Sequence, residues 1–194
     1  MKKSTTFYHI ILDQSGSMSD CINQTLNGLA NQRKEILAIA NEFPEQDIRV
    51  GLTVFDHNVI IKYRNLSVTE LSRMDGFHYY PNGSTALLDA IGISVADTER
   101  LMGSDDSAVM IIFTDGYENS SKEYRHEQIK NLIQAKEATE KWSFTYLGAT
   151  LDAVEIAKSL NIKMENSFAF EKQHMDKDAF GRSTMALKNF MGKF

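Results

Sequence analysis

The sequence predicts an α/β protein with a doubly wound, mostly parallel sheet, one antiparallel edge strand and helices on both faces. Two observations predict this fold class. Apolar runs of strand length alternate with amphipathic segments of helix length along the whole chain. Helical connections of this length imply right-handed crossovers between parallel strands. Because no repeat, linker or shift in composition divides the series, we expect a single domain over residues 1–194.

The first third of the chain predicts three strands and one long helix. Residues 7–12 (FYHIIL) form an almost wholly apolar strand, as expected for a sheet covered on both faces. A helix follows over residues 19–43 and is closed by Pro44. A second strand over residues 50–55 turns into an antiparallel edge strand over residues 59–63. Three side chains are candidates for the cap of the long helix: Ser17, Ser19 and Asp20.

The middle of the chain continues the alternation. Residues 67–84 indicate a long loop with a short helical piece, and residues 85–102 predict a helix. Residues 109–113 (VMIIF) are the most apolar strand, and residues 122–140 predict a charged amphipathic helix. Residues 143–148 (SFTYLG) complete this part as a further strand.

The C-terminal part predicts a helix capped near Thr150, a short strand over residues 167–170 and a last helix over residues 176–190. His9 falls within the first strand, where a hydrogen-bonded histidine of the core or of the sheet surface is expected. Four apolar residues of the last segment are expected in the core: Met175, Phe180, Leu187 and Phe190.

The composition excludes several classes of protein. A hydrophobic content of 42% with 24% charged residues is typical of a globular domain with a full core. A net charge of −5 without a long basic run argues against sequence-independent nucleic-acid binding, which depends on neutralising phosphates. The apolar runs are too short for a membrane span or a secretory segment. The single cysteine, Cys21, fits a reducing compartment, so we expect a cytoplasmic protein that binds no membrane.

Oxygen-bearing side chains gather where three of these elements meet one edge of the predicted sheet. In doubly wound sheets, ligands bind beyond the carboxyl ends of the strands, near the point where the strand order reverses. Asp13, Ser15 and Ser17 alternate, so an extended backbone would point them in one direction. The three segments are residues 13–17 (DQSGS), residues 83–85 (GST) and residues 114–116 (TDG).

This set of oxygens favours a hard divalent cation, and the lack of a Cys or His cluster argues against zinc, copper or an iron–sulfur group. If Ser15, Ser17 and Thr85 coordinate through neutral hydroxyls, the charge of the ion stays largely uncompensated. Asp13 and Asp115 could then hold coordinated waters by hydrogen bonds. The result would be an electrophilic ion with an open position, suited to a carboxylate from a partner protein.

The pattern Asp13-x-Ser15-x-Ser17, followed by Thr85 and by Asp115 within TDG, resembles the metal-ion-dependent adhesion site of the von Willebrand factor A domain. All five positions occur in the order of that family, and the strand and helix order over the whole chain is also similar. The resemblance implies Mg²⁺ or Mn²⁺ as the cofactor, an Asp or Glu side chain of a partner as the ligand, and a terminal helix that moves on ligation. By likeness to intracellular bacterial members, we expect a partner in a multiprotein assembly such as an AAA+ ATPase complex.

Other interpretations of the same residues stay open. A magnesium-dependent phosphoester hydrolase could use these carboxylates and the ion, but no P-loop, paired Asp nucleophile or G-x-S-x-G elbow accompanies them. We therefore favour a binding module over an enzyme. A metal-free scaffold is a third possibility, because each candidate ligand taken alone could be a turn or helix-capping residue.

Three further residues are candidates for the surroundings of the site. Asp89 could accept a hydrogen bond beside the ligands, or be a solvated carboxylate, or compensate the helix dipole. Tyr80 and Tyr117 are candidates for contact with a partner, because aromatic side chains dominate the hot spots of protein interfaces.

Overall fold

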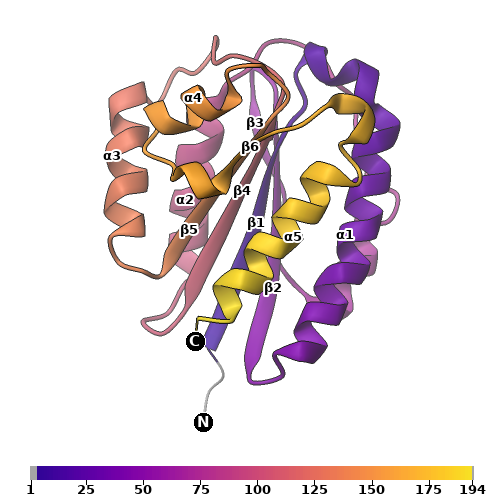
Figure 1. Ribbon diagram of the computed structural model, residues 1–194, viewed down its shortest axis with the longest axis vertical. Coiled ribbons are helices and arrows are strands. Elements are labelled where there is room, and N and C mark those ends of the chain that lie inside the picture. The colour runs from indigo at the N-terminus through magenta and orange to yellow at the C-terminus, as the bar shows by residue number, and fades with distance from the viewer. Residues whose placement is uncertain (1–3, 194) are drawn as a thin grey trace.

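A computed structural model describes residues 4–193, and its strands form one sheet in the order β3-β2-β1-β4-β5-β6 (Figure 1). β3 runs antiparallel to β2, and every other neighbouring pair is parallel. The prediction of a mostly parallel sheet with one antiparallel edge strand is confirmed. The strands are β1 (Ser4–Asp13), β2 (Gln46–Phe55), β3 (Val59–Ser67), β4 (Ser107–Thr114), β5 (Trp142–Gly148) and β6 (Ser167–Ala169).

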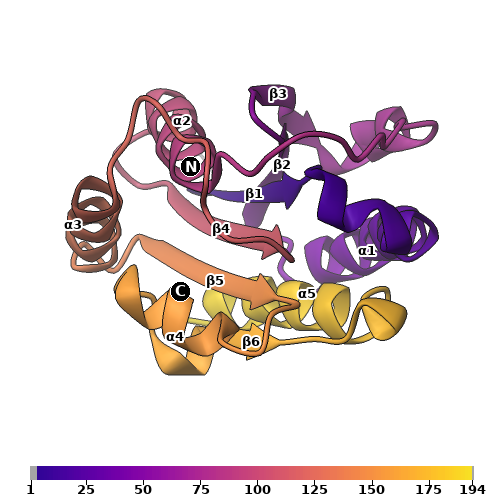
Figure 2. The ribbon, with the colours of Figure 1, turned by 90° about the horizontal axis from the view of Figure 1, so that it is seen from above.

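Helices cover both faces of this sheet, as Figure 2 shows from above. One face packs against α1 (Ile22–Glu42) and α5 (Asp178–Met191). The opposite face packs against α2 (Leu87–Leu101), α3 (His126–Glu137) and α4 (Ala153–Ser159). Short 3₁₀ turns complete the chain: η1 (Gly16–Cys21), η2 (Val68–Met74), η3 (Met164–Asn166) and η4 (Lys172–His174).

The central strand β1 supplies side chains to both cores, because successive residues of a strand point to opposite faces. Tyr8, Ile10 and Leu12 pack with the α1 and α5 side. Phe7 and Ile11 pack with the α2, α3 and α4 side. The expected core residues of the last segment, Met175, Phe180, Leu187 and Phe190, are buried as predicted.

The start of the first long helix differs from the prediction. Residues 16–21 form the 3₁₀ turn η1, and α1 begins only at Ile22. None of the three predicted side chains caps α1, whose capping position is Cys21. The physical reason is that Ser17 and Asp20 are engaged elsewhere: the Ser17 hydroxyl donates to Asp115, and Asp20 forms an ion pair with Lys172.

Two other helix boundaries are also corrected. The helix predicted over residues 122–140 spans only His126–Glu137, because the backbone N–H groups of residues 122–124 donate to the Asp89 carboxylate instead of starting a helix. The helix predicted to be capped near Thr150 has Asp152 at its capping position, and no side chain caps it.

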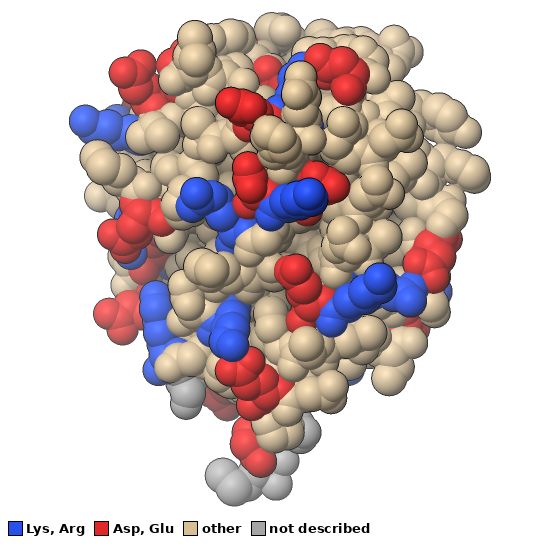
Figure 3. Space-filling view, turned by 45° about the vertical axis from the view of Figure 1, so that its right-hand side comes forward, with Lys and Arg blue, Asp and Glu red and all other residues tan. Residues whose placement is uncertain are grey.

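The surface described by the structure mixes charges of both signs. On the face shown in Figure 3, Lys and Arg side chains are interspersed with Asp and Glu. Lys188 of α5, for example, lies 2.8 Å from Glu42 of α1. Among the described residues, no helix combines the length and apolar character that crossing a bilayer requires.

Of the two environments expected for His9, the structure shows the core. His9 is 3% exposed, its Nε2 atom lies 2.8 Å from Thr53 Oγ1, and its Nδ1 atom lies 3.4 Å from Thr98 Oγ1. Burial lowers the pKa of His9 from 6.5 to about 4, and the nearby Asp97 carboxylate offsets only part of that effect. The imidazole is therefore neutral in the folded protein at neutral pH.

We expect His9 to destabilise the protein in acid. Between pH 6.5 and about 4 the unfolded chain binds a proton at this residue and the folded chain does not, so the free energy of unfolding falls as the pH is lowered. At pH 5 the loss amounts to about 2 kcal/mol. Urea unfolding of the wild type and of His9→Gln, at pH 7.5 and at pH 5, measures it. The wild type should lose more stability than the variant; an equal loss would contradict the assignment.

Candidate metal centre

The carboxyl ends of β1 and β4 bring two of the predicted site segments together. These strands are neighbours in the sheet, and the strand order reverses between them. β1 ends at Asp13 and β4 ends at Thr114, with Asp115 directly after it. Both carboxylate side chains are buried, since Asp13 is 0% and Asp115 8% exposed. The topology alone therefore places two buried acids at the position where doubly wound sheets bind ligands.

Backbone hydrogen bonds attach the segment around Gly83 to the loop after β1. Asn82 N donates to Gln14 O at 2.8 Å, and Gly16 N donates to Gly83 O at 3.1 Å. Gly83 has a φ of +71°, a left-handed conformation that glycine adopts without strain. These bonds fix the position of Thr85, two residues further on.

Thr85 is also attached to the loop after β4. Its N–H donates to Asn119 Oδ1 at 2.8 Å, and its carbonyl accepts from Asn119 N at 3.0 Å and Ser120 N at 3.2 Å. Thr85 is 3% exposed. The three segments predicted from the sequence thus form one hydrogen-bonded unit.

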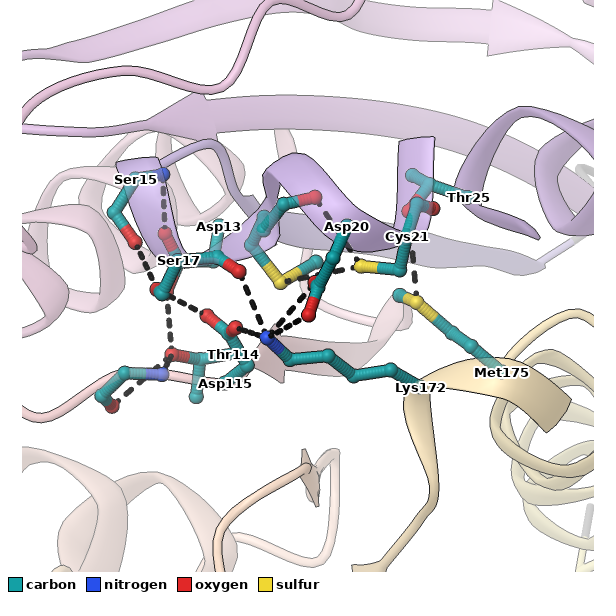
Figure 4. A network of polar contacts seen from close by, with 12 residues as sticks. Asp13, Ser15, Ser17, Asp20, Cys21, Thr25, Thr114, Asp115, Lys172 and Met175 are labelled. Atoms are coloured by element: carbon teal, nitrogen blue, oxygen red, sulfur yellow. Dashed lines mark hydrogen bonds and ion pairs between the residues drawn. The ribbon is translucent and has the colours of Figure 1, made fainter. Parts of the chain in front are cut away.

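The polar side chains of the first and third segments form a continuous network (Figure 4). Ser15 N donates to Asp13 Oδ1 at 2.7 Å, and Thr114 Oγ1 donates to Asp13 Oδ2 at 2.6 Å. The hydroxyls of Ser15 and Ser17 lie 3.0 Å apart, and Ser17 Oγ donates to Asp115 Oδ1 at 2.5 Å. The carboxylates are therefore ordered by hydroxyl and backbone donors.

Gly116 shows that oxygens from all three segments approach one point. A Cβ atom at this glycine would lie 2.9 Å from Thr85 Oγ1, 3.5 Å from Ser17 Oγ and 3.6 Å from Asp13 Oδ2. The three oxygens thus lie within 3.6 Å of one point, which a side chain at residue 116 would occupy. Oxygens gathered so closely from three segments suit a hard divalent cation.

The chemistry of the donors supports the same type of ion. The described residues contain no group of three or more His, Cys, Asp or Glu side chains placed to hold a metal, so hydroxyls would supply much of the coordination. Asp115 Oδ2 is buried, accepts no hydrogen bond within the geometric limits and lies 2.5 Å from the Lys172 ammonium, so this oxygen already attracts a cation.

Comparison with protein-family profiles matches residues 9–178 to the von Willebrand factor type A (VWA) domain. The chain belongs to this family. VWA domains are metal-dependent protein-interaction modules and commonly bind a divalent ion at the adhesion-site motif. A search of curated proteins found no match.

Solved structures with the same fold come from distant proteins. Proximal thread matrix protein 1 from the mussel byssus is 16% identical, with a TM-score of 0.68 over 95% of this chain and 46% of that one. A VWA protein from Catenulispora acidiphila is 16% identical, with a TM-score of 0.62 over 95% and 43%. The pilus tip protein Mfa5 of Porphyromonas gingivalis is 10% identical, with a TM-score of 0.64 over 98% and 97%. This chain thus spans less than half the length of the first two proteins.

Burial dominates the electrostatics of Asp13 in this VWA domain. Burial raises the pKa of Asp13 to about 6, although hydrogen bonds from Thr114 and Ser15 act in the opposite direction. The neighbouring Asp115 carboxylate adds a smaller upward contribution to the pKa. The second carboxylate thus disfavours ionisation of Asp13, and a nearby positive charge would favour it.

Lys172 supplies such a charge, and sequence analysis missed it. Its ammonium Nζ lies 2.5 Å from Asp115 Oδ2, 2.9 Å from Asp20 Oδ1 and 2.7 Å from the carbonyl oxygen of Ser17 (Figure 4). The Asp115 contact is an ion pair outside hydrogen-bonding geometry. Burial lowers the pKa of Lys172, but the two carboxylates outweigh it and raise the pKa above its usual range.

Tyr79 and Glu118 are further residues that the sequence did not single out for these roles. The Tyr79 hydroxyl donates to the carbonyl oxygen of Asp13, and this tyrosine is 3% exposed. Glu118 accepts hydrogen bonds from the backbone of Leu88 at 2.9 Å and of Ser121 at 2.8 Å. Tyr79 lies in an aromatic stretch, residues 77–80 (FHYY), which indicates loop packing. Nothing in the sequence distinguishes Glu118 from a surface acid.

Asp89 lies in the first turn of α2, where a carboxylate compensates the helix dipole. It is 6% exposed, so the prediction of a solvated carboxylate is wrong. Its oxygens accept hydrogen bonds from three backbone N–H groups of the loop before α3, those of Lys122, Glu123 and Tyr124. Asp89 therefore fixes the loop that follows the third site segment.

Tyr80 and Tyr117 remain candidates for partner contact. Tyr80 is 70% exposed and stacks on His78 with ring centroids 5.8 Å apart. Tyr117 is 58% exposed, and its hydroxyl donates to Asp152 Oδ1 at 3.0 Å. Both aromatic side chains are accessible. Tyr80 precedes the second site segment and Tyr117 directly follows the third.

We expect Gly116→Ala to weaken metal binding without unfolding the domain. The new methyl group would enter the space between Thr85 Oγ1 and Ser17 Oγ, where a cation would be held. The shift in melting temperature on adding Mg²⁺ or Mn²⁺ measures binding, because an ion that binds only the folded state stabilises it. Gly181→Ala is the matched control, since its Cβ meets nothing within 4 Å. Equal metal-induced shifts in the two variants would contradict the placement of the site.

We expect Asp89→Ala to release the loop over residues 122–125. Removing an acceptor of three backbone N–H groups costs about 2 kcal/mol or more. Trypsin should cleave several times faster after Lys122 and Arg125. Asp89→Asn should be intermediate, because it retains Oδ1, the acceptor for Glu123 and Tyr124. Glu99→Ala, an exposed change on the same helix, serves as control. If this control variant is cleaved as fast as Asp89→Ala, the role of Asp89 in fixing the loop is contradicted.

Proposed function

We propose that this VWA domain is a divalent-cation-dependent protein-binding module. The observation that carries the proposal is the convergence of Thr85 Oγ1, Ser17 Oγ and Asp13 Oδ2 beside Gly116. These oxygens come from three segments that backbone hydrogen bonds join into one unit. Five residues would hold the ion directly or through water: Asp13, Ser15, Ser17, Thr85 and Asp115.

Neutral hydroxyls are the reason that such an ion would bind an acid. Three of the five proposed ligands carry no charge, so the ion retains most of its positive charge. Ser17 is exposed, which places one side of the site at the surface. A carboxylate of an Asp or Glu side chain from a partner would complete the coordination there. The bound metal supplies the electrophilic position, and the protein supplies its orientation.

We propose Mg²⁺ or Mn²⁺ as the ion, because all candidate ligands are oxygens. A related structure, again of proximal thread matrix protein 1 from the mussel byssus, is described as having a zinc-occupied MIDAS motif, that is, a metal-ion-dependent adhesion site. That structure is 14% identical to this chain, with a TM-score of 0.67 over 95% of this chain and 46% of that one. It supports a divalent ion as the type of cofactor, and the oxygen donors of this chain favour a harder one.

The cellular setting is part of the proposal. The buried free thiol of Cys21 supports a cytoplasmic location. We also propose, as the resemblance of the sequence motif implies, a partner in a multiprotein assembly such as an AAA+ ATPase complex. A hydrolase is less well supported, because both oxygens of Asp13 already accept hydrogen bonds, which does not favour a free nucleophile.

Metal binding and partner capture test this function together. Isothermal titration should show one Mn²⁺ site in the wild type. Asp13→Ala and Thr85→Ala should weaken it at least tenfold, whereas Ser19→Ala, an exposed change in the adjacent turn η1, should not. Proteins captured from lysate on the immobilised domain in Mg²⁺ should elute with EDTA and be missing from both ligand variants. Capture that is indifferent to EDTA and to the two variants would refute the proposal.

A further inference from the structure

We propose that Lys172 is an internal competitor of the divalent ion, so that metal entry releases the segment between β6 and α5. The inference rests on the proposed metal site and goes beyond it. It assigns to one lysine the control of metal affinity, and it assigns to the metal an effect on a distant part of the chain.

The first argument is the set of oxygens around the ammonium group. Nζ of Lys172 lies 2.5 Å from Asp115 Oδ2, 2.7 Å from Ser17 O and 2.9 Å from Asp20 Oδ1. Two of these three residues, Asp115 and Ser17, are proposed metal ligands. The ammonium group is therefore a cation bound to the rim of the same site.

The second argument is electrostatic. The Asp115 side chain is only 1% exposed and that of Lys172 is 27% exposed, so water screens their ion pair incompletely. A divalent ion held by Ser17 Oγ and Asp115 would place two further positive charges within a few ångströms of Nζ. Like charges at this separation repel, and both cations draw on the single negative charge of Asp115. The ion therefore binds more weakly while Lys172 keeps this position.

The third argument is that Lys172 ties two distant segments together. It belongs to η4 and contacts Ser17 and Asp20 of η1, more than 150 residues earlier in the chain. Met175 follows η4 closely and is completely buried, with its sulfur 3.5 Å from Thr25 Oγ1. The segment thus has buried attachments in Phe170 and Met175 and one charged attachment in Lys172. A divalent ion that displaces the ammonium group removes the charged attachment alone.

Titration with Mn²⁺ alone tests the inference on the whole chain. Lys172→Met removes the charge and keeps much of the aliphatic stem, and Lys172→Gln is a second neutral variant. Both should bind Mn²⁺ at least tenfold more tightly than the wild type. Lys172→Arg retains the charge and should stay near the wild type. Lys188→Met is the matched control, because Lys188 pairs with Glu42 on α1 and not with the site; its affinity should be unchanged.

Hydrogen exchange provides the readout of release. In the wild type, the amides of residues 171–177 should exchange faster in saturating Mn²⁺ than without it. In Lys172→Met they should exchange equally fast in both conditions, because the charged attachment is already missing.

The outcomes separate this inference from the proposed function. If the wild type binds Mn²⁺ and the neutral variants bind it no more tightly, Lys172 positions Asp115 instead of competing, and only the inference fails. If neither the wild type nor any Lys172 variant binds Mn²⁺, the proposed function fails and the inference falls with it. Unchanged exchange of residues 171–177 on Mn²⁺ binding would overturn the release of the segment.

Discussion

The burial of the Asp13 carboxylate at the end of the central strand is the constraint on which the rest of the site depends. A carboxylate without solvent contact needs donors for both oxygens. Ser15 N serves Oδ1 and the Thr114 hydroxyl serves Oδ2. The first of these bonds turns the chain directly after β1, and the second ties β1 to the end of β4. The buried Tyr79 hydroxyl, which donates to the carbonyl oxygen of Asp13, fixes the same residue from the loop before Gly83.

Acidic side chains also replace regular secondary structure in the loop that follows the third segment. Asp89 takes the backbone donors of residues 122–124, and Glu118 takes those of Ser120 and Ser121. Both acids therefore order a loop that contains no helix or strand of its own. The hydrogen bonds between Thr85 and Asn119 join this ordered loop to the start of α2. The position of the Thr85 hydroxyl thus follows from carboxylates that are not among the proposed ligands.

These interactions explain how far the sequence could predict the structure. Apolar runs such as residues 109–113 are local signals, and they identified the central strands correctly. The spacing of Asp13, Ser15 and Ser17 is also local, so the candidate ligands were readable. The helix starts and caps could not be predicted, because they depend on contacts between distant residues. Asp89 binds Lys122, 33 residues away, and Ser17 binds Asp115, 98 residues away. Lys172 lies 155 residues from Ser17 and stands in an ordinary charged stretch, so no pattern marks it.

The charge balance of the site gives Lys172 its significance. Asp13 and Asp115 are buried acids of the site, and Asp20 is an exposed acid that pairs with Lys172. Lys172 is the cation that the structure pairs with Asp115 and Asp20, whereas Asp13 is satisfied by neutral donors. One positive charge thus faces three acidic groups, and the balance favours a further cation. Hydroxyl ligands do not change this charge balance, because they supply oxygen atoms without negative charge. The strength of such a site is then set less by its ligands than by how firmly its own lysine holds Asp115.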